Sequence, residues 1–403
     1  MKEMKTILLS MLLCITAWAQ TSAAEASIAS AEPQRDSIRF SLLTCSPGQE
    51  IYALFGHSAI RFHNVTRGLD FAFNYGLFSF SAPNFVMRFI KGETDYELGA
   101  SPFEYFKESY AARGSYVVEQ ELNLTYPEKL RLLALLEENY RPENRVYRYN
   151  YFYDNCTTRA RDKIEESIEG TVVYPEKHDN VSYRKIIHRY TPGHDWAELG
   201  IDFCLGKTAD DSISYREQMF APFVLVEAMD SAQIVNPDGT RRPLVKSHQL
   251  VVSPVKIAPE PDPLPSPMTL ALALLIAVAL CCAWELKHKR YLWGVSALLF
   301  AGQGIAGCIV AFLFFFSIHP TVDTNYLVII FNPLPLVYLP WLIYRACKRK
   351  VDYYHWVNAA VLTLFIAFWC VIPQEFNLVV LPLATILLIR SLTYIIICKK
   401  PHQ

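Results

Sequence analysis

The sequence predicts an α+β domain outside the cytoplasm, followed by an all-α bundle of five membrane helices. Two observations predict this division. Apolar residues make up 52% of the 403 residues, but residues 268–398 consist mostly of apolar segments. Residues 25–255 instead have the mixed charge of an ordinary soluble domain. The formal net charge of −1 gives no electrostatic reason to expect nucleic-acid binding.

The first 19 residues have the features of a secretory signal peptide in the usual order. Lys2 and Lys5 precede an apolar run, and a small-x-small sequence at 17–19 supplies a cleavage site. An uncleaved anchor helix is the alternative. A signal peptide would place the domain that follows outside the cytoplasm.

Five later segments are apolar, and each is near the roughly 20 residues that a hydrocarbon core requires. They are Met268–Trp284, Leu292–Phe316, Leu327–Tyr344, Trp356–Ile372 and Leu378–Cys398. Basic residues gather in alternate connections, at 287–290, 345–350 and 399–400. By the positive-inside rule these connections are cytoplasmic, so the first domain lies outside and the C-terminus inside. Arg390, in the last segment, either faces the bundle or a lipid phosphate, or extends toward the inner surface.

The exported domain shows strand patterns first and a cysteine-bearing helix later, which favours an α+β fold. Strands are expected over 37–45, 57–63, 71–80, 115–124 and 145–152. Residues 82–113 are expected to form short helical turns, and 182–229 several helical pieces. Thr125 and Glu128 match a capping box at the start of a further helix. The proline-rich stretch 256–267 is typical of a stiff, extended tether.

Cys156 is the candidate nucleophile. Asp154 or Asn155 is expected to cap a helix from Cys156 to about Glu169, which puts the thiol at a helix N-terminus. A free thiol titrates at about pH 8.5, and the helix dipole favours its anion. The alternative is a buried structural cysteine, but the polar neighbours Asp154, Asn155, Thr157 and Thr158 argue against simple burial.

His57 is the candidate base for this thiol. It follows Gly56 in an apolar strand, and the glycine permits close approach of another group. A histidine base needs a third group to hold its orientation. Asn74 is the candidate orienting residue, because it is a polar residue in the apolar strand expected to pair with the histidine strand. His63 and Asp70, which flank the same hairpin, remain alternatives.

Other polar residues complete the expected site. Arg159 and Arg161 add positive charge near the thiol and, with Tyr153, are candidate substrate-binding residues. The tyrosine-rich run 147–153 is either structural or part of an apolar acyl groove. The other exported histidines lack close ligand spacing, so neither a metal nor a cofactor is expected. Cys45 and Cys204 could form a disulfide that leaves Cys156 free, but the sequence does not establish the pairing.

The blocks around these residues resemble a known family. A strand histidine followed by Asn-Cys at a helix start is similar to the permuted papain-like fold of NlpC/P60 and lecithin:retinol acyltransferase relatives. Four segments more closely resemble the Lnb family of lipoprotein N-acyltransferases: 55–59, 74–76, 120–124 and 154–162. The resemblance covers nearly the whole mature chain. It implies that Cys156 and His57 are catalytic, and it assigns no third residue.

The resemblance also implies a reaction and a location. Cys156 would take an acyl chain from a phospholipid as a thioester and pass it to the α-amine of a diacylated lipoprotein. The protein would be a multi-pass protein of the bacterial inner membrane, with a periplasmic catalytic domain. Two alternatives remain open. A membrane-tethered cysteine peptidase or amidase would need no five membrane helices, and a non-enzymatic binding domain would give Cys156 and His57 no reason to meet.

Overall fold

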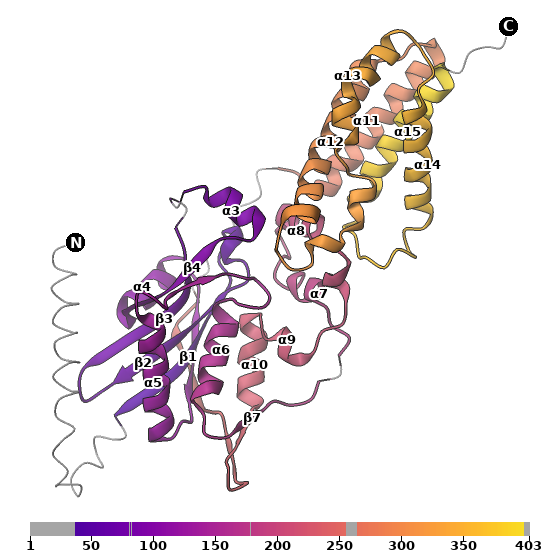
Figure 1. Cartoon of the computed structure of the whole chain (residues 1–403). Helices are drawn as coiled ribbons and strands as arrows, with labels where there is room; N and C mark the ends of the chain where they lie inside the picture. The colour runs from indigo at the N-terminus through magenta and orange to yellow at the C-terminus, as the bar shows by residue number, and fades with distance from the viewer. Residues whose placement is uncertain (1–36, 80, 82, 178, 255–263, 399–403) are drawn as a thin grey trace, which may run out of the picture.

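The computed structural model describes residues 37–79, 81, 83–177, 179–254 and 264–398. The predicted signal peptide and most of the predicted tether lie outside these residues. Within them, an α+β domain with two sheets is followed by a helical bundle (Figure 1). The fold class expected from the sequence is therefore confirmed.

The exported domain is built on a seven-stranded antiparallel sheet with the order β10-β5-β1-β2-β3-β4-β6. Its strands are β1 (Ile38–Cys45), β2 (His57–Asn64), β3 (Leu69–Leu77), β4 (Asp95–Pro102), β5 (Val117–Leu122), β6 (Val146–Arg148) and β10 (Val245–Val252). Four of them lie where strands were expected. Strand β4 was not expected, because residues 82–113 read as helical turns, and β6 is shorter than predicted.

Helices cover both faces of this sheet. The helices that pack on it are α4 (Phe103–Ala112), α5 (Tyr126–Tyr140), α6 (Cys156–Ser167) and α10 (Pro222–Ser231). The other helices of the domain are α3 (Phe85–Lys91), α7 (Tyr183–Ile187), α8 (Asp195–Cys204) and α9 (Tyr215–Gln218). The main core joins Phe40, Leu42 and Ile60 of the sheet to buried residues of α5, α6 and α10. Phe103, Phe106 and Tyr110 of α4 belong to a separate core cluster with Leu43 and Ala72.

Local signals explain where these elements begin. The backbone N–H of Thr125 donates to the Glu128 carboxylate at 2.7 Å, which confirms the predicted capping box of α5. A small second sheet holds strands that the sequence did not suggest: β7 (Thr171–Val173), β8 (Gln233–Val235) and β9 (Arg241–Pro243). Each has three residues, too few to show an alternating pattern.

The second part of the chain is a bundle of α11 (Pro267–His288), α12 (Trp293–Phe316), α13 (Leu334–Cys347), α14 (Tyr353–Ala367) and α15 (Val380–Cys398). Among the described residues, four stretches are long and apolar enough to cross a membrane: 267–288, 293–316, 326–347 and 380–398. The remaining predicted span corresponds to α14, which has 15 residues and ends at Ala367 rather than at Ile372. Turns fill the residues before Pro373, where a helix is disfavoured.

Arg390 points into the bundle. Its guanidinium lies 2.5 Å from the Glu285 carboxylate and 2.7 Å from the Ser296 hydroxyl, and both charged side chains are fully buried. Of the alternatives left by the sequence, the structure therefore shows the bundle-facing one. A buried charge is tolerated in a membrane helix when it is paired in this way.

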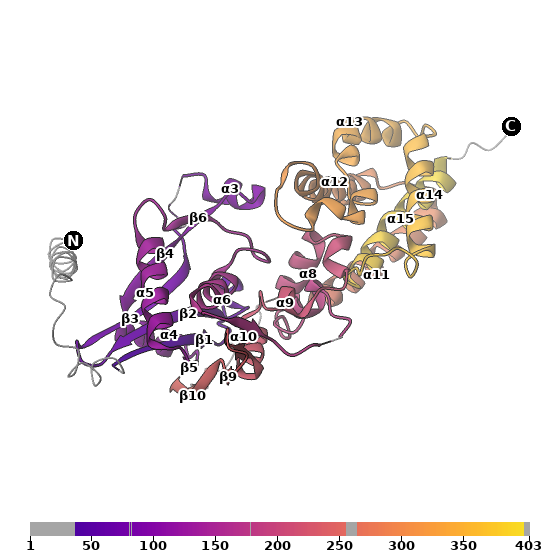
Figure 2. The ribbon, with the colours of Figure 1, turned by 60° about the horizontal axis from the view of Figure 1, so that its bottom comes forward.

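The exported domain rests on one end of the bundle, where α8 lies against α11 and α12 (Figure 2). The backbone N–H of Gly206 donates to Thr321 at 2.9 Å, and the Asn325 side chain donates to Phe203 at 2.9 Å. A Cβ on Gly206 would come within 2.5–2.7 Å of backbone atoms of 321–325, so only glycine permits this contact. The catalytic candidates therefore belong to a domain that is docked on the membrane part.

Gly56 fixes the start of β2 and hence the position of His57. Its φ is +74°, and a Cβ there would lie only 2.6 Å from the Cys45 carbonyl oxygen. Gly68, in the turn between β2 and β3, also has a positive φ of +63° but has no atom within 4 Å of such a Cβ. The two glycines thus share a conformational demand and differ in the space around them.

This difference gives a stability test. Gly68→Ala should cost about 1 kcal/mol, from the left-handed conformation alone. Gly56→Ala should cost roughly 1–3 kcal/mol more, from the clash with the Cys45 carbonyl. The melting temperature of the full chain in detergent would compare the two. Equal decreases would mean that the close approach at Gly56 does not constrain the strand.

Candidate active site

Asn155 determines where helix α6 begins. Its side-chain Oδ1 accepts from the backbone N–H groups of Thr157 at 2.8 Å and Thr158 at 2.9 Å. Its Nδ2 donates to the carbonyl of Phe220 at 3.0 Å, which ties the cap to the loop before α10. Of the two predicted caps, Asn155 is the one that the structure uses. Cys156 therefore occupies the first residue of the helix, as expected.

Strands β2 and β3 bring His57 and Asn74 together. Asn74 Oδ1 lies 2.5 Å from His57 Nε2, so the imidazole N–H donates to the amide oxygen. This bond leaves Nδ1 as the free, basic nitrogen. The orienting role predicted for Asn74 fits this contact, whereas the alternative Asp70 pairs with Arg61 at 2.7 Å.

The thiol and the imidazole meet above Gly76. A Cβ at Gly76 would lie 3.8 Å from Cys156 Cβ, 3.9 Å from His57 Cε1 and 3.9 Å from the Tyr147 hydroxyl. The side chains of Cys156 and His57 interact closely enough for each to shift the pKa of the other. Residues separated by 99 positions thus form one unit, and the φ of +86° at Gly76 favours glycine beside it.

Electrostatics favour the ionised pair. Burial by itself would raise the pKa of the Cys156 thiol. The charge of His57, its hydrogen bond and the backbone N–H of Ser58 outweigh burial and lower that pKa to about 7. Burial likewise works against a charged His57, but Cys156 and the bond to Asn74 raise the pKa of the imidazole. A thiolate beside an imidazolium is therefore accessible near neutral pH.

The predicted substrate-binding residues lie on or beside α6, and each of the two arginines pairs with an acidic residue near it in sequence. Arg159 pairs with Asp154 at 2.6 Å, and its guanidinium carbon lies 3.6 Å from the centroid of the Tyr147 ring. Arg161 is buried, pairs with Asp162 at 2.7 Å and donates to the Arg216 carbonyl at 3.1 Å. Tyr153 is exposed on the surface. A substrate-binding role for the three residues stays a prediction.

The other exported cysteines contrast with Cys156. All cysteines of the described residues are free, so the structure contains no bridge between Cys45 and Cys204. Burial raises the pKa of the Cys45 thiol far above its ordinary range, although Cys45 pairs in register with His57 across β1 and β2. Burial also raises the pKa of Cys204 to about 11. Only Cys156 among the three has a lowered pKa.

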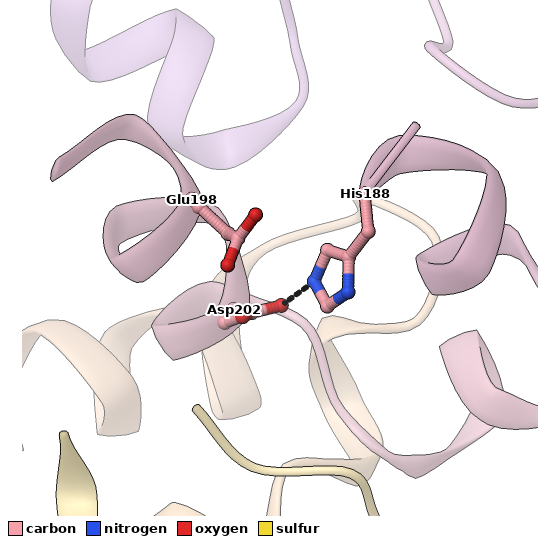
Figure 3. Close-up of side chains that lie close together, drawn as sticks. All are labelled: His188, Glu198 and Asp202. Carbon is pink, nitrogen blue, oxygen red and sulfur yellow. Dashed lines mark hydrogen bonds and ion pairs between the residues drawn. The ribbon is translucent and has the colours of Figure 1, made fainter. Parts of the chain in front are cut away.

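The fold gathers a set of possible metal ligands that sequence spacing did not reveal. Ligand atoms of His188, Glu198 and Asp202 lie within 4.8 Å of one another (Figure 3). Asp202 is already fully engaged: it accepts from His188 at 2.9 Å, from Arg184 at 2.8 Å and from Asn377 at 3.0 Å. The expectation of no metal rested on the spacing of histidines along the chain, and the fold brings His188 together with two carboxylates that this spacing did not reveal. The positive charge of Arg184 disfavours a cation at this cluster.

Comparisons with known proteins agree with the two-part organisation. Residues 26–189 match the family described as the Lnb N-terminal periplasmic domain, and residues 259–401 match the Lnb transmembrane domain. Together these matches cover most of the chain, including Cys156, His57 and Asn74. Comparison with curated proteins and with solved structures gave no match.

The ion pair makes a prediction about pH. Alkylation of Cys156 by iodoacetamide, followed by peptide mapping of the intact protein, should rise through an apparent pKa of about 7. His57→Ala should move this midpoint above the ordinary thiol range of about 8.5, because burial remains while the compensating charge is lost. At pH 7 the rate should then fall more than about tenfold.

Cys45 provides an internal control, since its raised pKa should leave it unmodified over the same pH range. Asn74→Ala should shift the Cys156 midpoint in the same direction as His57→Ala but less far, because it removes one hydrogen bond to the imidazole. An unchanged midpoint in His57→Ala would show that the two groups are not coupled.

Proposed function

The chain belongs to the Lnb family, and from this premise we propose that it is a lipoprotein N-acyltransferase. It is a membrane protein with a periplasmic N-terminal domain. The proposed reaction moves an acyl chain from a phospholipid to the α-amine of a diacylglyceryl-cysteine lipoprotein. The membrane is the bacterial inner membrane, with the C-terminus in the cytoplasm, as the basic connections indicate.

One observation carries the proposal: a thiol with a lowered pKa meets an oriented histidine in a domain docked on membrane helices. The lowered pKa makes the sulfur a nucleophile near neutral pH. The asparagine holds the imidazole with Nδ1 free to take the thiol proton. Docking on the bundle keeps the site beside lipids, where both proposed substrates are anchored.

In the first half-reaction, His57 Nδ1 takes the proton of Cys156. The sulfur then attacks the carbonyl carbon of a phospholipid ester, and the tetrahedral intermediate collapses with cleavage of the ester C–O bond. The imidazolium returns its proton to the departing alkoxide. The products are a lysophospholipid and a thioester on Cys156.

In the second half-reaction, the α-amine of the lipoprotein cysteine attacks the thioester carbon. His57 takes a proton from the attacking nitrogen, the C–S bond breaks, and an amide forms. The enzyme returns to its starting state. Because both substrates are confined to the same membrane surface as the tethered site, their effective concentration at the thiol is high.

The proposed steps use the chain's own groups and include no cofactor. The sulfur carries the acyl group, the imidazole moves the proton, and Asn74 orients the imidazole. The reaction needs no redox step and no metal-bound water, because the incoming amine is itself the nucleophile in the second step.

Incubation with phospholipid alone tests the first half-reaction. The purified full-length protein should gain the mass of one acyl chain on Cys156, and hydroxylamine should remove it. An equivalent amount of lysophospholipid should appear. Cys156→Ala should abolish both products, whereas Cys45→Ala should retain them if the protein folds, because the Cys45 thiol stays protonated.

Adding a synthetic diacylated lipopeptide should discharge the adduct onto its amine and restore the free thiol. Mass spectrometry of the lipopeptide reports this second step. A protein that hydrolyses cell-wall peptides and forms no acyl adduct would be a cysteine peptidase or amidase, and the transferase proposal would be wrong.

A further inference from the structure

Helix α3 exposes an unusual amount of apolar surface for its length. Val86 is 69% exposed, Met87 51% and Phe89 44%. The helix contains no acidic residue, and Arg88 and Lys91 lie in its last turn. Contiguous exposed apolar residues on a folded domain mark a surface that another apolar phase covers. Apolar and basic residues on one short helix suit the boundary between lipid headgroups and acyl chains.

The position of α3 indicates what covers its exposed apolar side chains. Its last residues hydrogen-bond to the segment just after membrane helix α12: the N–H of Ile318 donates to Lys91 at 2.9 Å, and the Ser317 hydroxyl donates to Ile90 at 2.8 Å. Figure 1 shows α3 beside the end of the bundle on which the exported domain rests. It is therefore held at the level where the membrane span ends.

The apolar surface of α3 continues the lipid-facing surface of the bundle. Phe315 and Phe316, the last residues of α12, are exposed, and so is Ile318 immediately after them. Hydrocarbon covers such side chains on a membrane helix. Because α3 is bonded to residues directly following this aromatic end, its apolar surface lies next to the lipid-facing surface of α12.

Ring contacts run from α3 to Tyr96 of β4, and strand pairing continues this line to Tyr147 beside the catalytic pair. The Phe89 and Phe85 rings are stacked with centroids 6.2 Å apart, and Phe85 stacks on Phe78 at 5.7 Å. Phe78 meets Tyr96 edge to face at 5.0 Å. Tyr96 pairs in register with Tyr147, whose hydroxyl lies beside Gly76 together with Cys156 and His57. We call Phe89, Phe85, Phe78, Tyr96 and Tyr147 the aromatic row.

The chain order of β3 supports this connection. Asn74 contacts His57, and Gly76 lies against Cys156 and His57. Phe78 follows two residues later, just past the end of β3. One short segment thus leads from the imidazole partner, past the thiol, to the ring that contacts α3.

We propose that α3 inserts into the outer leaflet and is the place where the donor phospholipid leaves the bilayer, its acyl chain lying along the aromatic row toward Cys156. This inference rests on the proposed function for the identity of the lipid as acyl donor. Such a route is needed because the ester of a phospholipid at the membrane surface must reach the Cys156 sulfur in the exported domain. Apolar rings along the route keep the acyl chain out of water.

Photocrosslinking tests the membrane contact without requiring catalysis. In a Cys156→Ala background, p-benzoylphenylalanine would replace Val86, Met87 or Phe78 in the full chain. The protein would be placed in nanodiscs of phosphatidylethanolamine and phosphatidylglycerol. Illumination should give phospholipid adducts at all three positions, identified by intact mass. Val65 is the matched control, because it is 53% exposed but lies in the turn between β2 and β3.

A second arm measures delivery of the donor. Met87→Asp should slow acyl-adduct formation on Cys156 from nanodisc phospholipid about tenfold, because a carboxylate opposes entry into the apolar layer. Val65→Asp should leave that rate unchanged. Melting temperatures equal to wild type would show that both variants fold.

The outcomes separate the two proposals. Adducts at Val86 and Met87 without acylation of wild-type Cys156 would support the membrane contact and overturn the acyltransferase assignment together with the donor route. Normal acylation of wild type, with no more adduct at Val86 or Met87 than at Val65, would overturn the inference about α3. Equal rates for Met87→Asp and wild type would overturn it as well.

Discussion

The coupling of one thiol to one imidazole is the interaction on which the rest of the account depends. Burial alone would keep both groups neutral, and a neutral thiol is a poor nucleophile. Proximity reverses this outcome, because each charge stabilises the other. The backbone that creates this proximity includes a cap that begins α6 at Cys156 and two positive-φ glycines, one before His57 and one beside the pair.

Local sequence signals predicted the parts of the fold that carry this pair. The strand that begins at His57, the strand that holds Asn74 and the helix that begins at Cys156 all lie where their patterns placed them. Asn74 could be singled out because a polar residue in an apolar strand needs a partner, and strand pairing offers His57 as that partner. The contact between α6 and the β2–β3 hairpin was predicted because the Cys156 thiol needs a base, and not from the spacing of apolar residues.

Other features were hidden for physical reasons. Strand β10 is mostly exposed along its length, so it shows no apolar alternation, and β7 to β9 have three residues each. The positive charges of Arg159 and Arg161 were expected near the thiol, but each guanidinium pairs with an acidic residue close in sequence. The cluster of His188, Glu198 and Asp202 depends on how α7 packs against α8, which spacing along the chain does not encode.

The docking of the exported domain on the membrane helices is the reason why a lipid substrate is proposed for the Cys156–His57 pair. A Cys-His unit alone would suit several acyl-transfer reactions, including peptide hydrolysis. The contacts of α8 and α3 with the bundle place this unit in a domain held against the bilayer. The connection through aromatic side chains then favours an acyl chain over a peptide as the group that reaches the sulfur.

The most direct test is the state of lipoprotein N-termini in cells. N-terminal peptides would be analysed by mass spectrometry in cells that lack this protein and in the same cells supplied with wild type or Cys156→Ala. The proposed acyltransferase activity predicts N-acylated, triacylated peptides only with wild type, and diacylated peptides with a free amine in the other two cases. Full N-acylation in cells that carry Cys156→Ala at wild-type protein levels would contradict it.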